Sequence, residues 1–132
     1  MARTIAAVVQ QTGVSSSEAR LRQHRVTVDR PGAAGGSDGG PMGGELFLAA
    51  VGGCFMSNLL AAARARDVVL QDACVELEGT LADAPARYEM IHMRVSAGGG
   101  GDALPALVEI ADRGCIMTNT LRGRLPVTIT IA

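Results

Sequence analysis

The segment ELFLAAVGGCFMSNLLAAARA, Glu45–Ala65, decides how this chain can fold. It is apolar on nearly every helical face, with one serine, one asparagine and one arginine as the main interruptions. A helix without a polar face is typical of a buried position, so the sequence predicts a central helix over 45–65 that is buried all round. Gly52 and Gly53 each cost such a helix about 1 kcal/mol relative to alanine. We therefore expect another backbone to approach this pair closely.

The segments on either side of the central helix alternate between strand and helix patterns. Runs rich in β-branched residues favour strands, whereas a second segment repeats its apolar residues at helical spacing. This order predicts a single α+β domain over 1–132. The predicted elements are an N-terminal β-hairpin within 4–30, a glycine-rich loop over 31–44, the central helix over 45–65, an antiparallel pair of strands within 74–95, a second helix over 102–114 and a closing strand over 127–131.

Length and composition limit what such a domain can do. The chain has 132 residues, which suits one domain and leaves no room for a separate cofactor-binding module. Hydrophobic residues make up 48% of the chain, yet it has no Trp, one Tyr and two Phe, so the core must be aliphatic. A monomer of this size buries only about two-thirds of its unfolded surface. We therefore expect oligomerisation, which would bury further apolar surface.

Charge and hydropathy exclude several partners. The formal net charge is −1 and the 12 basic residues are scattered, so the sequence predicts no nucleic-acid partner. The N-terminal residues lack the apolar run and cleavage site of a secretory signal, and no stretch contains about eighteen uninterrupted apolar residues. We therefore expect a cytoplasmic protein without a membrane partner.

Three cysteines are the candidate reactive groups. Their number and spacing, without a CxxC motif, argue against a disulfide framework and a zinc ribbon. Cys54 follows the glycine pair and, from position alone, is a small buried hydrophobe more often than a reactive thiol. Cys115 follows the predicted end of the second helix, where exposure is easier, and Cys74 is interpreted as structural. Neither His24 nor His92 has ligand-type spacing to a cysteine, so no metal site is predicted.

Two motifs carry a resemblance to a known family. The segment GPMGGELFLAAVGGC, 40–54, is similar to the glycine-proline loop and the helix ending in Gly-Gly-Cys of the OsmC/Ohr family. The segment LVEIADRGCIMTNTL, 107–121, resembles the second motif of that family, a helix ending in Cys followed by a Ser/Thr-Asn-Thr-Leu turn. The resemblance covers nearly the whole chain from Val26 onward.

This resemblance implies both a fold and an activity. The fold is OsmC-like, with antiparallel strands wrapped around central buried helices in an intertwined homodimer. The activity is that of a thiol-dependent peroxidase acting on organic hydroperoxides in oxidative stress defence. Cys54 takes the place of the peroxidatic residue and Cys115 that of the resolving residue. Their disulfide would be reduced by an external dithiol, either lipoyl-type or a small thiol, without a metal, haem or flavin.

The chain departs from the family pattern around the first cysteine. The better-known reductases have a catalytic Glu ten residues before that cysteine, where this chain has Gly44. Glu45 lies one residue later, and one residue turns a helix by about 100°. The family also uses an arginine to favour the thiolate, because a nearby cation stabilises it. Arg25 and Arg30 are the candidates, and each has the alternative role of a solvated strand charge.

Two other functions remain open on the sequence. One is a non-catalytic OsmC-like dimer that binds a small apolar or electrophilic ligand, or that senses oxidants through Cys54; Gly44 favours this alternative. The other is a structural or interaction protein with inert thiols. The distance between the two sulfurs is the observation that best separates these hypotheses from the peroxidase.

We expect the protein to be a homodimer in solution whose interface contains the 45–65 helix. The reason is the apolar character of that helix on every face. Analytical ultracentrifugation at micromolar concentration tests this expectation. A stable, well-folded monomer would contradict it.

Overall fold

The computed structural model describes residues 2–132 and has the α+β architecture that the sequence predicts. The chain divides into two compact units, one ending at Phe47 and one beginning at Leu48. Each unit contains one three-stranded sheet. The long helix α1, Gly43–Ala65, begins in the first unit and continues in the second.

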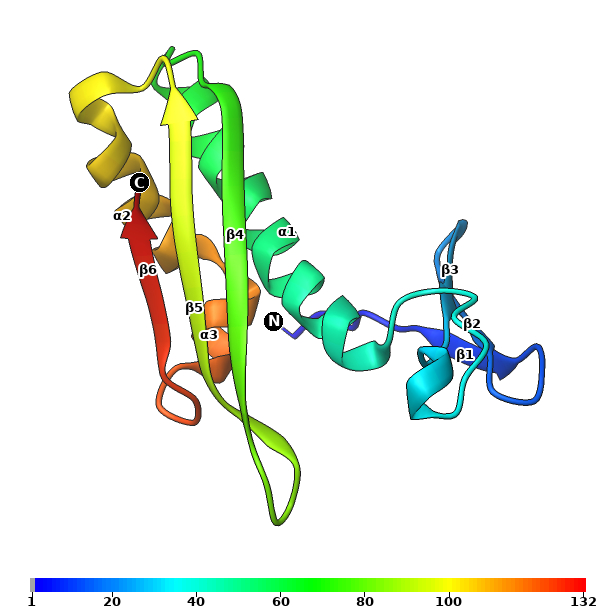
Figure 1. Cartoon of the computed structure of the whole chain (residues 1–132). Helices are drawn as coiled ribbons and strands as arrows, with labels where there is room; N and C mark the ends of the chain where they lie inside the picture. The colour runs from blue at the N-terminus through cyan, green and yellow to red at the C-terminus, as the bar shows by residue number, and fades with distance from the viewer. Residues whose placement is uncertain (1) are drawn as a thin grey trace. The chain divides into compact units, whose positions relative to one another are not determined.

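The first unit contains an antiparallel sheet in the order β1-β2-β3 (Figure 1). The strands are β1, Val8–Gln11, β2, Ser17–Leu21, and β3, His24–Val28. The β-hairpin predicted within 4–30 thus has a third strand, because a turn separates β2 from β3. Arg22 adopts a left-handed conformation there, with φ of 56°. The sequence hides this turn, since no glycine or asparagine marks it.

A buried carboxylate organises the glycine-rich segment that follows β3. Asp29 is only 3% exposed. Its Oδ1 accepts a hydrogen bond from the N–H of Arg30 at 2.7 Å, and its Oδ2 accepts from Ser37 at 3.2 Å and Gly39 at 3.1 Å. These bonds close a loop that contains the short 3₁₀ helix Gly32–Ala34. The hydrogen bond from Gly39 is the largest cause that lowers the pKa of Asp29, with further contributions from Ser15, Arg30 and Ser37.

The second unit has a sheet in the order β4-β5-β6. Strands β4, Gln71–Ala82, and β5, Arg87–Gly98, are antiparallel and their pairing is extensive. Strand β6, Val127–Ile131, joins β5 in parallel. A parallel neighbour needs a long crossover, which two helices supply here: α2, Leu104–Gly114, and α3, Ile116–Leu121.

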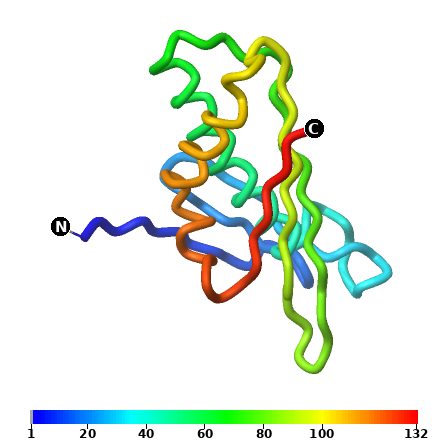
Figure 2. Tube along the Cα trace, turned by 90° about the vertical axis from the view of Figure 1, so that its left-hand side faces the viewer, coloured from blue at the N-terminus to red at the C-terminus, as the bar shows by residue number. Residues whose placement is uncertain are grey.

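The helices of the second unit all lie on one face of this sheet, as the two views in Figures 1 and 2 show. Because side chains alternate along a strand, β5 directs Ile91, Met93 and Val95 into the core and leaves its other face polar. Helix α1 packs one stripe into the same core. The buried residues of that stripe are Val51, Gly52, Phe55, Leu59, Ala62 and Ala63.

Outside this stripe α1 is half-buried or exposed, so the expectation of burial all round is not met in this structure. Leu60 is 46% exposed, and its neighbours on that side are mostly small residues. Helix α1 is long and apolar enough to cross a membrane, with a mean hydropathy of 1.8. Length and composition alone do not distinguish such a helix from the core helix of a soluble protein. The close neighbour expected at Gly52 is a side chain: an added Cβ would lie 2.5 Å from Leu77 Cδ1.

The second predicted helix, over 102–114, starts slightly later than expected. Asp102 lies in a short 3₁₀ helix, Gly101–Ala103, and α2 begins at Leu104 without a side-chain cap. The residues after Cys115, which the family resemblance implies to be a turn, form the helix α3. A single extended residue, Cys115, separates the two helices, with φ of −80° and ψ of 116°.

We predict that the Asp29 loop opens in acid. Because the pKa of Asp29 is lower in the folded protein, the ionised carboxylate stabilises the fold at every pH above 3.8, the usual pKa of the group. This stability is lost as the pH falls through the lower pKa of the folded state. Amide hydrogen exchange of residues 31–44, corrected for the intrinsic rate, should show this loss of protection. Asp29→Asn should already exchange faster at neutral pH, because its amide cannot accept all three bonds.

The matched control is Asp38→Asn in the same loop, where the aspartate is exposed and has φ of 54°. Asparagine tolerates this conformation equally well, so protection should not change. Wild-type protection in Asp29→Asn at neutral pH would contradict the role assigned to the carboxylate.

Candidate functional site

Helix α1 places Cys54 at the edge of its buried stripe. Phe55 and Val51 on one side of Cys54 are fully buried, whereas Gly53 is exposed. Cys54 is consequently half-buried. An added Cβ at Gly53 would meet nothing within 4 Å, so the glycine leaves open space on this side of the helix. The thiol is therefore held by the core and also lies close to that open side.

Cys115 is fully buried at the junction of α2 and α3, which corrects the expectation of an accessible loop cysteine. Cys115 is both the C-cap of α2 and the N-cap of α3. Helix α3 therefore begins immediately after it, and Cys115 stays in the core. Thr118, one turn further on, is also fully buried. Its hydroxyl donates hydrogen bonds to the carbonyl oxygens of Asp112 at 3.2 Å and Cys115 at 3.4 Å.

The two cysteines meet although they are far apart in the sequence. Cys54 lies close enough to Cys115 to contribute to the raised pKa of the Cys115 thiol, and neither cysteine is in a disulfide. Burial is the main cause that raises the pKa of Cys115; hydrogen bonds from the backbone and side chain of Thr118 oppose it, and the neighbouring Cys54 adds to it. At neutral pH Cys115 therefore keeps its proton and can donate it to the Cys54 sulfur. This arrangement can form a disulfide.

Asn58 is a neighbour of this pair that the sequence analysis noted only as an interruption of an apolar helix. It lies one helical turn after Cys54, and its Nδ2 donates a hydrogen bond to the Cys54 carbonyl oxygen at 2.8 Å. Thr118 was likewise overlooked within the second motif. The sequence signal was present in both cases, because each is a polar residue among apolar helix positions. Only the contact between the helices gives these residues a common location.

The other predicted site residues lie in the first unit. Glu45 accepts a hydrogen bond from the N–H of Met42 at 2.9 Å, so it caps the start of α1. Arg25 is 3.9 Å from Glu18 and its side chain is 69% exposed, in agreement with the alternative of a solvated strand charge. Both residues thus have a local structural role in this unit.

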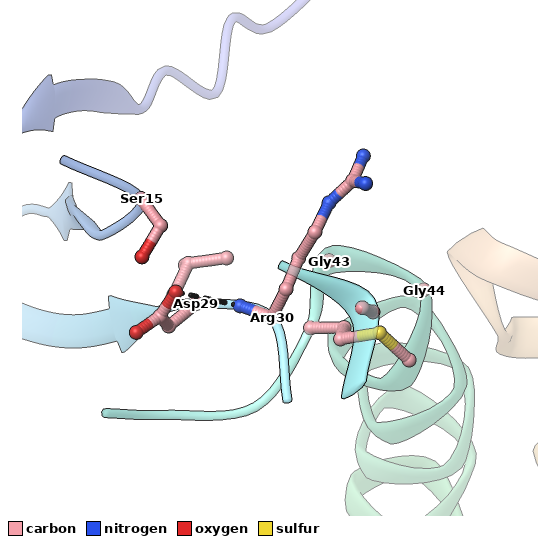
Figure 3. Close-up of a pocket in the computed structure, with 8 residues that line it drawn as sticks. Ser15, Asp29, Arg30, Gly43 and Gly44 are labelled. Atoms are coloured by element: carbon pink, nitrogen blue, oxygen red, sulfur yellow. Dashed lines mark hydrogen bonds between the residues drawn. The ribbon is translucent and has the colours of Figure 1, made fainter. Parts of the chain in front are cut away.

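Arg30 lines a pocket of the first unit with a volume of about 430 Å³. Gly43 and Gly44, at the start of α1, line the same pocket, together with Ser15 and Asp29 (Figure 3). The side chain of Arg30 points away from the Asp29 carboxylate, while its backbone N–H bonds to it. The arginine and the position of the missing family glutamate are therefore brought together in one cavity.

The remaining cysteine and the histidines lie elsewhere in the fold. Cys74 is exposed on β4, opposite Ser96 on β5, so it is not a residue of the core. The ring nitrogens of His92 contact the hydroxyls of Thr128 and Thr130 on β6. Within residues 2–132 no group of three or more His, Cys, Asp or Glu side chains has an arrangement that could hold a metal ion.

The fold has many counterparts among solved structures. An organic hydroperoxide resistance protein from Elizabethkingia anophelis matches at 21% identity and a TM-score of 0.77, over 100% of this chain and 97% of its own. The organic hydroperoxide resistance protein OhrB of Bacillus subtilis matches at 20% identity and 0.72, over 96% and 98%. An OsmC-like protein from Mycoplasma pneumoniae matches at 16% identity and 0.83, over 100% and 98%. At these identities the likeness shows the fold alone.

A comparison with curated protein sequences found no match. The model of the OsmC-like protein family, by contrast, matches residues 35–130, which is well over half of the chain and includes both cysteines that meet between α1 and α3. Together with the shared fold, this match establishes that the chain belongs to the OsmC-like protein family.

Proposed function

We propose that the protein is a thiol-dependent peroxidase that reduces organic hydroperoxides, using Cys54 as the nucleophile and Cys115 as the resolving thiol. The observation that carries this proposal is the contact between the two free thiols. Cys54 is half-buried beside open space, whereas Cys115 is fully buried and its pKa is raised. The more accessible thiol therefore attacks, and the buried one waits in its protonated form.

The proposed cycle has three balanced steps. The Cys54 thiolate attacks the O–O bond, so an S–O bond forms, the O–O bond breaks, and the alcohol leaves after taking a proton. Cys115 then attacks the sulfenic acid; an S–S bond forms, and its proton leaves with the hydroxide as water. An external dithiol, lipoyl-type or small, reduces the disulfide by exchange and becomes oxidised itself.

The proposed cycle needs a source of dithiol, and we propose that it takes place in a homodimer. A reducing cytoplasm would supply the dithiol. We further propose a homodimer, because Leu60 and the small residues on the same side of α1 leave an apolar surface uncovered in one copy. The family model and the names of two structural relatives support a hydroperoxide substrate.

A second candidate function is an oxidant sensor that forms the same disulfide without sustained turnover. It is favoured by the local roles of Glu45 and Arg25, each of which is engaged within the first unit. Gly44 in place of the family glutamate points in the same direction. The two functions differ in whether hydroperoxide is consumed in excess of protein, which a turnover assay measures directly.

We predict that Cys54 is oxidised before Cys74 and Cys115. Mass spectrometry after sub-stoichiometric cumene hydroperoxide should find the first oxygen, or a disulfide to Cys115, at Cys54. Cys115 is shielded by burial, and Cys74 is exposed but has no thiol in hydrogen-bond contact among the described residues. First modification of Cys74 would overturn this assignment.

With a lipoyl-type or small dithiol, the protein should reduce organic hydroperoxides faster than hydrogen peroxide. Cys54→Ser should abolish turnover. Cys115→Ser should react once and stop, because the sulfenic acid has no resolving thiol and is open to over-oxidation. Cys74→Ser is the matched control and should retain full activity.

A coupled assay that follows hydroperoxide consumption distinguishes these outcomes. Consumption that stops at one equivalent in the wild type would favour the sensor over the peroxidase. In that case Gly44→Glu tests whether the missing carboxylate is what limits turnover.

A further inference from the structure

We propose that Asn58 is a positioning residue that holds the Cys54 sulfur opposite Cys115 and donates an N–H to it when it carries the negative charge. This inference rests on the proposed function for its biological meaning. Its physical content, which is the control of one thiol by one amide, stands on the contacts around Asn58 alone.

The Asn58 carboxamide is fixed on both of its ends. Its Nδ2 donates to the Cys54 carbonyl oxygen at 2.8 Å and reaches Cys54 Sγ at 3.9 Å. Its Oδ1 lies against α2, because a Cβ built at Gly114 would be 2.9 Å away from it. The glycine immediately before Cys115 thus makes room for the amide. Asn58 therefore spans the gap between the helix that carries Cys54 and the residue that precedes Cys115.

This placement suits a donor to a sulfur anion. A thiolate accepts hydrogen bonds more strongly than a thiol, and a hydrogen bond to the charged form stabilises that form. The 3.9 Å distance to the neutral sulfur is at the outer limit of such a contact. Catalytic hydrogen bonds that are long in the resting state commonly shorten when charge develops. The short bond to the carbonyl keeps the amide in place until then.

Within the second unit few charges compete with this role. The sheet residues that face the helices are apolar, among them Leu77 and Met93. Cys115 is a titratable neighbour of Cys54, since Cys54 contributes to its raised pKa. Charged residues near Cys115 in the sequence form ion pairs: Arg122, directly after α3, with Asp112 at 2.6 Å, and Arg113 with Glu109 at 3.3 Å.

The test measures the alkylation rate of Cys54 by iodoacetamide as a function of pH, in a chain with Cys74→Ser and Cys115→Ser so that one thiol remains. This readout needs no peroxidase activity. Asn58→Ala should lower the rate at pH 7 by about threefold and move the profile to higher pH, because a charge-assisted bond is lost. Asn58→Asp keeps the size but replaces the donor with a carboxylate, and should lower the rate by about tenfold or more.

Two further variants make the test specific. Asn119→Ala is the matched control, because the Asn119 Nδ2 also donates to a backbone carbonyl, that of Arg113 at 2.9 Å, and this bond does not involve Cys54. This variant should leave the profile unchanged. Gly114→Ala leaves Asn58 in the sequence and displaces its amide, so the profile should shift in the same direction as Asn58→Ala by a smaller amount. It also keeps the inference testable if an Asn58 variant fails to fold.

The outcomes separate this inference from the proposed function. Unchanged profiles in folded Asn58→Asp and Gly114→Ala proteins overturn the role of Asn58, whatever the turnover of the wild type. A shifted profile in a wild type that shows no turnover supports the role of Asn58 and counts against the peroxidase alone. Equal shifts in Asn119→Ala and Asn58→Ala would show a general loosening of the helices and would also overturn the inference.

Discussion

The packing of one stripe of α1 against the sheet of the second unit is the contact on which the rest of that unit depends. Phe55 and Leu59 are fully buried, as are Ile91 and Met93 on the central strand β5. With so few aromatic residues in the chain, this mainly aliphatic contact, to which Phe55 adds one ring, removes apolar area of the unit from water. The stripe fixes the rotation of α1 about its axis, and this rotation puts Cys54 at the edge of the core.

The short connection between α2 and α3 supplies the second half of the site. A parallel pairing of β5 and β6 needs a crossover, and the crossover here consists of two helices separated by one extended residue. That residue is Cys115. Its sulfur is buried because both helices pack on the same face of the sheet as α1, and Thr118 in the next turn donates its hydroxyl to the Cys115 carbonyl oxygen. The topology of the sheet thus determines where the second thiol lies.

The two thiols differ in environment rather than in chemistry. Cys115 is fully buried and its pKa is raised, whereas Cys54 has open space beside Gly53 and an amide donor one turn away. This difference is the physical basis of the division into an attacking and a resolving thiol that we propose. In the first unit, Asp29 gives the glycine-rich loop its shape, and Arg30 and Gly44 line the pocket beside it.

The sequence by itself determined the family, the α+β class and the identity of the two cysteines, because these depend on local patterns and motifs. It also located α1 to within two residues, since a long apolar run with a capping Glu45 has one local solution. Tertiary structure alone decided that Cys115 is buried, that α3 is a helix and that the N-terminal strands number three. It also decided that Asn58 meets Gly114. Local residue patterns mark single residues such as Asn58 as unusual, but which segments meet in space depends on tertiary packing, which those patterns do not encode.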